Sequence, residues 1–238
     1  MDTQRIALVT GANKGIGFEI ARQLASAGVR VVLGARNLGF GEAAAQKILE
    51  GTATATHLDL DDHASIARTA AEIEAGYGRL DILVNNAGIF DFADAPPSSA
   101  SLEAVRRTME VNFFGTLAVT QAMLPLLRKA PAGRIVNLSS SLGSLTLNGS
   151  PDSTYYGAQF IGYNASKAAL NMMTVQLREE LRDTNIVVNS ISPGFVGTDL
   201  NGGTGPLTPE EGARLPVRFA LEGEENGGFF EAEGRTPW

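Results

Sequence analysis

Short runs of apolar, β-branched residues alternate along the chain with longer stretches in which apolar residues recur at helical spacing. Runs of the first kind predict strands, and stretches of the second kind predict helices. The predicted strands are Ile6–Thr10, Val29–Gly34, Thr54–Asp59, Ile82–Asn85, Arg134–Leu138 and Ile186–Ile191. The predicted helices are Ile16–Ala27, Glu42–Leu49, Ser65–Tyr77, Ala104–Lys129 and Tyr163–Leu181.

This alternation predicts the fold class. Apolar strands separated by helices indicate a parallel sheet that is buried on both faces. Right-handed crossovers then give a doubly wound, mostly parallel α/β sheet in three α/β/α layers. Thr208-Pro-Glu-Glu211 combines an N-cap, a proline and a glutamate, and predicts a last helix from Thr208. The tail Gly227-Gly-Phe-Phe230 predicts a turn and an edge strand, and we expect one domain over residues 1–238.

Composition and charge narrow the class of partner. The chain has 238 residues, 44% of them hydrophobic, which is enough for one large core. A net charge of −7 argues against nucleic acid or an anionic membrane as the main partner. There are no cysteines, and His57 and His63 are predicted to be solvated, so we expect no metal site. No signal-like segment and no run of about 18 apolar residues occurs, which predicts a cytoplasmic protein.

A glycine-rich loop follows the first strand. The sequence Thr10-Gly-Ala-Asn-Lys-Gly-Ile-Gly17 leads from that strand into a helix. Glycines there permit a tight turn, close approach to a pyrophosphate and packing of the helix on the sheet. The start of the helix supplies free N–H groups for phosphate. Glycines also form ordinary turns, but the strand–loop–helix context favours a dinucleotide site.

The end of the second strand favours NADP(H) over NAD(H). A carboxylate at this place would hold the ribose 2′-OH of NAD, whereas this chain has Gly34-Ala-Arg-Asn37. Arg36 offers a planar fork to a 2′-phosphate, and Lys14 adds a second cation. The alternative, that both are solvated surface cations, remains open.

Tyr163 and Lys167 stand four residues apart and therefore share one face of a predicted helix. The pKa of a free tyrosine, near ~10, is too high for base chemistry at neutral pH, and we expect the lysine ammonium to lower it. Tyr155 and Tyr156 have no basic residue four positions later. Residues 139–141 are serines at the end of a strand, where a hydroxyl can bond a substrate carbonyl oxygen.

In combination, these motifs resemble the short-chain dehydrogenase/reductase family over almost the whole chain, from Ile6 to Trp238. The matching motifs are Thr10-Gly-x-x-x-Gly-x-Gly17, Asp59, Asn85-Asn-Ala-Gly88, Asn112, the serine after the fifth strand, Tyr163-x-x-x-Lys167 and Pro193-Gly-x-x-x-Thr198. The resemblance implies a Rossmann fold and hydride transfer between a nicotinamide and a carbonyl or alcohol carbon. The hydride chemistry then belongs to the cofactor, and no metal is needed.

The resemblance also implies four catalytic residues. Tyr163 would be the acid in reduction and the base in oxidation, and Lys167 would bind the nicotinamide ribose and tune Tyr163. Ser140 would orient the substrate, although a slip of one position would select Ser139 or Ser141 instead. Asn112 would open its helix locally and hold a water in a proton relay; the alternative is a polar residue at a kink.

The remaining implied contacts are to the cofactor. Asp59 would receive the adenine amino group, although capping of the next helix is a rival role for it. Thr198 and the Pro193-Gly194 turn would contact the nicotinamide amide. The full implied set is Gly11, Asn13, Lys14, Gly15, Ile16, Gly17, Arg36, Asp59, Leu60, Asn86, Ala87, Gly88, Tyr163, Lys167, Pro193, Gly194, Val196 and Thr198.

The segment before Tyr163 is about twice as long as in most members of the family. The extra residues, roughly 144–157, resemble the carbonyl-reductase-like branch, in which such an insertion can cover the helix faces used for oligomerisation. We therefore expect a monomer or homodimer rather than a tetramer. Wall residues of an open pocket for apolar or aromatic ketones and aldehydes are predicted to be Phe90, Phe92, Leu142 and Phe195, each of which is equally compatible with ordinary packing.

The sequence thus predicts an NADP-dependent ketone or aldehyde reductase with a small-molecule substrate. An oxidising dehydrogenase or an epimerase on the same scaffold remains open, because the reaction is reversible. A catalytically idle NADP-binding sensor is a third reading, although such proteins typically lack the tyrosine or the lysine.

Overall fold

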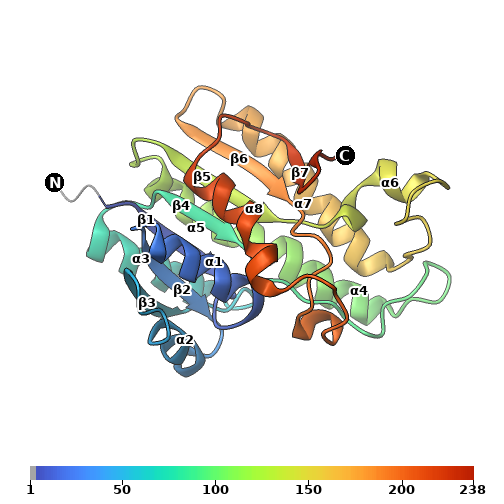
Figure 1. Cartoon of the computed structure of the whole chain (residues 1–238), viewed down its shortest axis with the longest axis horizontal. Helices are drawn as coiled ribbons and strands as arrows, with labels where there is room; N and C mark the ends of the chain where they lie inside the picture. Colours follow the sequence, from blue (N-terminus) through green and yellow to red (C-terminus); the bar gives the residue numbers. More distant parts are fainter. Residues whose placement is uncertain (1–3) are drawn as a thin grey trace.

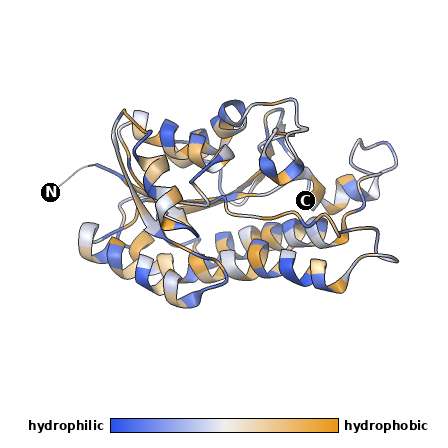
Figure 2. Ribbon diagram, turned by 90° about the horizontal axis from the view of Figure 1, so that it is seen from below, coloured by the Kyte–Doolittle hydropathy of each residue, from blue (hydrophilic) through white to orange (hydrophobic). Residues whose placement is uncertain are grey.

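The computed structural model describes residues 4–238, which form an eight-stranded sheet flanked by helices on both faces (Figures 1 and 2). The strand order is β3-β2-β1-β4-β5-β6-β7-β8, and every neighbouring pair is parallel except the last. Strand β1 lies inside the sheet, β2 and β3 follow on one side of it, and β4 to β8 follow on the other. The predicted doubly wound, mostly parallel α/β fold is therefore confirmed.

The strands are β1 Ile6–Thr10, β2 Arg30–Ala35, β3 Thr52–His57, β4 Ile82–Asn85, β5 Gly133–Leu138, β6 Ile186–Ile191, β7 Phe229–Glu231 and β8 Gly234–Arg235. The α-helices are α1 Gly15–Ser26, α2 Leu38–Ala45, α3 His63–Tyr77, α4 Leu102–Met109, α5 Thr116–Leu127, α6 Leu145–Gly149, α7 Ile161–Glu180 and α8 Pro209–Leu221. Three further segments are helical turns of other kinds: η1 Glu110–Gly115, η2 Ser141–Gly143 and η3 Asp199–Asn201.

The sheet divides the hydrophobic core into two layers. Residues of β1 such as Val9 face helices α1 and α8, whereas their neighbours such as Leu8 face α3, α5 and α7. This alternation is the period-2 geometry of a strand, and because both faces are covered the strands are apolar throughout. Figure 1 shows α1 and α8 side by side over one face. No helix within residues 4–238 is both long and apolar enough to cross a bilayer.

Several predicted boundaries were wrong by a few residues, most of all that of the second helix. This helix runs over Leu38–Ala45 rather than Glu42–Leu49, because the Asn37 side chain accepts a hydrogen bond from the Phe40 N–H and starts the helix early. Strand β3 lies two residues before its predicted Thr54–Asp59, in register with β2, which itself lies one residue later than predicted. Side-chain caps and strand pairing thus decided these boundaries.

The predicted long helix Ala104–Lys129 is not continuous. It consists of α4 and α5 joined by the π-helical turn η1, which contains Asn112. A π-helical turn adds a residue to the helical repeat and is frequent at functional sites. Smaller differences are the starts of α1, α3 and α7 one to two residues earlier than predicted. The last helix begins after Thr208 in the predicted capping box.

The C-terminal tail closes the far edge of the sheet and holds the insertion. Phe229 and Phe230 pair with β6, as predicted for an edge strand, and β8 turns back beside them. The ring of the last residue, Trp238, stacks on Phe229 at 5.7 Å between centroids. The Trp238 carbonyl oxygen accepts hydrogen bonds from the N–H and hydroxyl of Thr146 in the insertion. The insertion is therefore fastened to the tail.

Candidate active site

The residues that the motifs single out lie around the carboxyl edge of the sheet. Strands β1 to β6 run in one direction, so the segments that follow them meet at this edge. The Gly loop, defined as residues 10–17, follows β1, and the segment 86–88 follows β4. The serines 139–141 follow β5, and Pro193 lies just beyond β6.

The Gly loop is built on close backbone contacts. Gly11 and Gly15 have φ values of +64° and +59°, which residues with a side chain rarely adopt. A Cβ on Gly17 would lie 2.4 Å from Asn86 Nδ2 and 2.5 Å from the Gly11 oxygen. The Asn86 amide donates to the oxygens of Thr10 and Gly11, at 2.8 and 3.2 Å. Glycine is thus required where helix α1 meets this loop.

The start of α1 fits an anionic group. Its N-cap residue, Lys14, makes no side-chain cap, and the first turn holds no acidic residue. The N–H groups at this end, together with the dipole of the helix, favour a phosphate. Thr198, beyond β6, faces the same place, because its Cγ2 lies 3.7 Å from the position of a Cβ on Gly15. The loop therefore suits the pyrophosphate of a dinucleotide cofactor.

The two predicted phosphate-binding cations differ in their contacts. Arg36 directly follows β2, is exposed and forms no ion pair within the described part of the chain. Lys14 instead pairs with Asp199, with 2.6 Å between Nζ and Oδ2 and side chains 65% and 77% exposed. Sequence reasoning missed Asp199, which lies far away in the chain. An exposed pair of this kind is weak, so Lys14 remains accessible to a competing anion.

Asp59 does not cap the following helix. The N-cap of α3 is Asp62, whose side chain accepts a hydrogen bond of 2.9 Å from the Ala64 N–H. The Asp59 carboxylate instead accepts from the Asp61 N–H at 3.2 Å, beyond the end of β3. The rival capping role of Asp59 is therefore wrong, and this partly buried residue lies at the carboxyl edge of the sheet.

Asn112 is held inside the π-helical turn. Its Oδ1 accepts from the Ile89 N–H at 2.8 Å, and its Nδ2 donates to the Ile89 oxygen at 2.9 Å. Nδ2 also donates to Ser166 Oγ at 3.0 Å, and Ser166 bonds the Tyr163 carbonyl oxygen at 2.8 Å. Asn112 thus links the segment after β4 to helix α7. Ser166 was not found from the sequence, because one serine in a helix carries no pattern.

The three consecutive serines after β5 have different neighbours. Ser139 donates to Asn171 Oδ1 at 2.7 Å and is buried. Ser141 donates to the carboxylate of Glu231 and to Ser192, facing the tail. Only Ser140, of these three, forms a side-chain hydrogen bond with Tyr163. Ser140 is thus the serine of the three that contacts Tyr163, and the orientation of the substrate by its hydroxyl stays a prediction.

Tyr163 and Lys167 share one face of α7, with the lysine Nζ 5.7 Å from the centroid of the tyrosine ring. Burial raises the pKa of Tyr163 to about 12, and the hydrogen bond with Ser140 offsets only part of this rise. Burial also lowers the pKa of Lys167 to about 8. The expected lowering of the Tyr163 pKa by the Lys167 ammonium is not seen in this structure, where loss of solvation dominates and only the hydrogen bond with Ser140 opposes it.

The Lys167 ammonium lies between the end of β5 and the segment that follows β4. Its Nζ donates to the Leu138 carbonyl oxygen at 2.8 Å, and it lies 3.6 Å from the position of a Cβ on Gly88. Such a Cβ would also stand 3.2 Å from Asn112 Oδ1. The side chains of Asn112, Ser140, Tyr163 and Lys167, here called the catalytic cluster, therefore converge from η1, the end of β5 and α7.

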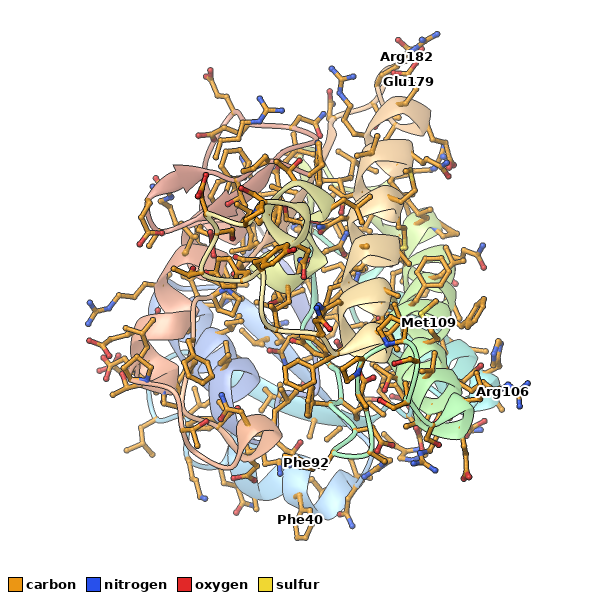
Figure 3. All side chains as sticks on the ribbon, turned by 90° about the vertical axis from the view of Figure 1, so that its right-hand side faces the viewer. Phe40, Phe92, Arg106, Met109, Glu179 and Arg182 are labelled. Atoms are coloured by element: carbon orange, nitrogen blue, oxygen red, sulfur yellow. The ribbon has the colours of Figure 1, made fainter. Side chains whose placement is uncertain are left out.

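Aromatic side chains line one side of Tyr163. The Phe90 ring lies 5.5 Å from that of Tyr163 and 5.1 Å from that of Phe160, centroid to centroid. Phe92, 75% exposed, contacts Phe90 edge-on and projects from the segment after β4 (Figure 3). Phe160 was not among the predicted wall residues, and only the fold brings it here. The exposed Phe195 follows Gly194 beyond β6, and Leu142 follows Ser141.

Comparisons with known proteins agree with this geometry. Residues 5–206 match the family model described as short chain dehydrogenase. The chain is 40% identical to short-chain dehydrogenase anuI of Penicillium roqueforti, over 93% of this chain and 90% of that protein. It is 36% identical to carbonyl reductase [NADPH] 1 of Macaca fascicularis, over 91% of each. The crystal structure of NADPH-bound carbonyl reductase from chicken fatty liver superposes with a TM-score of 0.84, at 28% identity and 99% coverage of both chains.

Proposed function

Because this chain belongs to the short-chain dehydrogenase/reductase family, we propose that it uses NADP(H) in preference to NAD(H) to reduce ketones or aldehydes. Membership makes the chain an NAD(P)-dependent oxidoreductase acting on a C=O or CH–OH group. The cofactor preference, the direction of the reaction and the role of each residue are the proposal. The convergence of the catalytic cluster beside the Gly loop is the observation that carries it.

The residues present fit a dinucleotide with a 2′-phosphate. The Gly loop and the start of α1 would hold the pyrophosphate, and Arg36 with Lys14 would hold the 2′-phosphate. Asp59 and Leu60 would contact the adenine, residues 86–88 would line the cofactor, and residues 193–198 would contact the nicotinamide amide. NADPH appears in the names of two of the similar proteins, which supports this preference.

Tyr163 is suited to donate a proton. When bound, the nicotinamide supplies the hydride to the carbonyl carbon. Ser140 would orient the carbonyl oxygen, and the Tyr163 hydroxyl would deliver its proton to that oxygen. A pKa of about 12 keeps this phenol protonated at neutral pH, which is the form that the acid role in reduction requires. Lys167, still mostly charged at pH 7, would bind the ribose and stabilise the developing phenolate.

The aromatic side chains beside Tyr163 favour apolar or aromatic carbonyl compounds. The rings of Phe90, Phe92 and Phe160 offer flat apolar surface, and Phe195 stands exposed beyond β6. A few polar groups among apolar walls are typical of small-molecule sites. The insertion is fastened to the tail by Thr146. Met172 and Val175 of α7 are exposed, so the insertion does not cover these two side chains. The expected monomer or homodimer stays a prediction.

The direct test is the loss of NADPH absorbance with a panel of aromatic, cyclic and aliphatic ketones and aldehydes, with NADH in parallel. We expect turnover with NADPH well above that with NADH, highest for the aromatic members. Turnover that is equal with both cofactors would contradict the cofactor preference alone. Tight NADPH binding without turnover in either direction would contradict the reductase itself and favour a nucleotide-binding sensor.

A further inference from the structure

The start of helix α7 is capped by a residue from a distant part of the chain. The residue before the helix, Phe160, makes no side-chain cap. Asp94, in the segment between β4 and α4, accepts from the Gly162 N–H at 3.0 Å through Oδ1 and from the Tyr163 N–H at 2.8 Å through Oδ2. The Ala95 carbonyl oxygen accepts from the Ile161 N–H at 3.2 Å. All three N–H groups of the first turn therefore bond to residues 94 and 95.

The Asp94 carboxylate is buried, with 8% of the residue exposed. No lysine, arginine or histidine within residues 4–238 forms an ion pair with it. Its other hydrogen bond comes from the adjacent Ala95 N–H at 2.9 Å. Its charge is thus compensated by backbone N–H groups and by the positive end of the dipole of α7. Burying a carboxylate without such partners is costly, so this contact holds its two sides together firmly.

The contact is sterically tight as well. A Cβ on Gly162 would lie 3.1 Å from Asp94 Oδ2 and 3.1 Å from the Cα of Val105 in α4. Glycine therefore allows the segment to lie directly on the first turn of α7. Tyr163 is the next residue, and its own N–H is one of the three that bond to the carboxylate. Any movement of this contact moves the backbone that carries the Tyr163 side chain.

The segment that carries Asp94 is also attached at its other end. Both backbone polar groups of Ile89 bond to the Asn112 amide, and Phe90, the next residue, packs its ring on that of Tyr163. Residues 89–95 thus form a strap that bonds to Asn112 at one end and to the start of α7 at the other. The strap lies along the aromatic side of Tyr163, where the substrate is proposed to bind.

We infer that Asp94 is a positioning residue for Tyr163: by capping α7 from the strap, it sets where the Tyr163 hydroxyl lies relative to Ser140 and Asn112. The inference rests on the proposed role of Tyr163 as the acid. A proton donor must lie within hydrogen-bonding reach of its acceptor, and a misplacement of about 1 Å costs about 100-fold in rate. The carboxylate itself need not touch substrate or cofactor for this effect.

The test compares Asp94→Ala and Asp94→Asn with the wild type. We expect Asp94→Ala to lower kcat by about 100-fold while the Kd for NADPH, measured by fluorescence titration, changes less than about threefold. Asp94→Asn keeps one acceptor oxygen and should recover part of the loss. The solvent isotope effect on kcat should rise in Asp94→Ala, because proton transfer from a misplaced Tyr163 limits the rate. A loss of folded protein alone would not change that isotope effect.

Asp62→Ala is the matched control, since Asp62 is a carboxylate that caps another helix, α3. It should leave kcat and the isotope effect unchanged. Gly162→Ala disturbs the same contact from the side of α7 and should reproduce the effect of Asp94→Ala. It therefore tests the inference even if the Asp94→Ala variant does not fold. Wild-type kcat and isotope effect in both Asp94→Asn and Gly162→Ala would overturn the inference.

Amide hydrogen exchange separates this inference from the proposed function. The Gly162 and Tyr163 amides should exchange faster in Asp94→Ala and at the wild-type rate in Asp62→Ala. If the wild type reduced no carbonyl compound and the amides still responded, the proposed reductase would fail while the capping contact stood. Unchanged exchange together with unchanged kcat in an active enzyme would overturn the positioning role alone.

Discussion

The Gly loop and the catalytic cluster lie at the same edge of the sheet but are built in different ways. The Gly loop is a local structure, in which eight consecutive residues form a turn whose glycines admit close backbone approach. The catalytic cluster is assembled from side chains of three separate elements, and its alignment depends on contacts such as those of Asn112 with Ile89. Cofactor binding should thus respond to changes of backbone space, and catalysis to changes of side-chain position.

Tyr163→Phe should separate the two regions most strongly. Loss of the hydroxyl removes the proposed proton donor, so we expect kcat to fall by about 1000-fold or more. The Kd for NADPH should change less than about threefold, because the Gly loop is untouched. Steady-state kinetics and fluorescence titration measure the two quantities. The control is Tyr156→Phe, a half-exposed tyrosine of the insertion. Retained activity in Tyr163→Phe would place the acid elsewhere.

Arg36→Asp should change the cofactor region without affecting the cluster. It removes a partner of the 2′-phosphate and adds an acceptor for a ribose 2′-OH, so the ratio of kcat/KM with NADPH to that with NADH should fall about 100-fold. The best kcat of the variant should stay close to that of the wild type. Arg182→Asp, just beyond the C-terminal end of α7 (Figure 3), makes the same change of charge away from the site. An unchanged ratio would refute the assignment of Arg36.

Gly17→Ala tests whether the Gly loop depends on backbone space. The added Cβ would meet Asn86 and the Gly11 oxygen, so the loop must shift. We expect NADPH affinity to fall about tenfold and the free energy of unfolding to fall by about 1–3 kcal/mol, as for other overpacked sites. The control is Gly76→Ala in α3. Gly76 is exposed, and a Cβ there would have no neighbouring atom within 4 Å, so this change should be neutral or stabilising. Equal behaviour of the two variants would contradict this view of the loop.

The pH dependence of reduction sharpens the view of the cluster. Burial lowers the pKa of Lys167 from 10.5 to about 8, so its ammonium is present at neutral pH and is lost as the pH rises through about 8. Tyr163, with a pKa of about 12, stays protonated over this range. The kcat/KM for reduction should be level below about pH 7 and fall up to about tenfold per unit above pH 8, because kcat/KM reports the pKa values of the protein before the substrate binds.

The control for the decline above pH 8 is Lys167→Arg, because a guanidinium stays charged at these pH values. Its residual activity should show no decline near pH 8. A wild-type rate that stays level up to pH 10 would show that the charge of Lys167 is not needed for reduction.

The sequence was most informative where neighbouring residues determine the structure. β1, β4 and β6 lie at their predicted bounds, because short apolar runs between turn residues leave little choice. The capping box at Thr208 was found because all its members lie within four residues. The start of α2 was missed, because the Asn37 cap competed with a hydrophobic pattern that begins later. The interruption of the helix at Asn112 was implied only by the family resemblance, and the structure shows that contacts with Ile89 after β4 hold it.

The same distinction applies to the site. Tyr163 and Lys167 share a helix, so their spacing alone placed them on one face, and the Gly loop carries its own turn. The family resemblance had already selected Ser140. Three contacts required the fold, because each joins residues far apart in sequence: that of Ser140 with Tyr163, that of Lys14 with Asp199 and that of Asp94 with the start of α7. The pKa of Tyr163 also required it, because burial depends on everything packed around the phenol.

By itself, then, the sequence of this protein determined the alternation of strands and helices, the glycine-rich turn after β1 and the types of residue at the candidate site. These are consequences of hydrophobic periodicity and backbone freedom, which act over a few residues. Only the tertiary structure decided which hydroxyl meets Tyr163, which carboxylate caps its helix and how strongly its proton is held. Those properties depend on distance and solvation in space, and residues distant in the sequence set both.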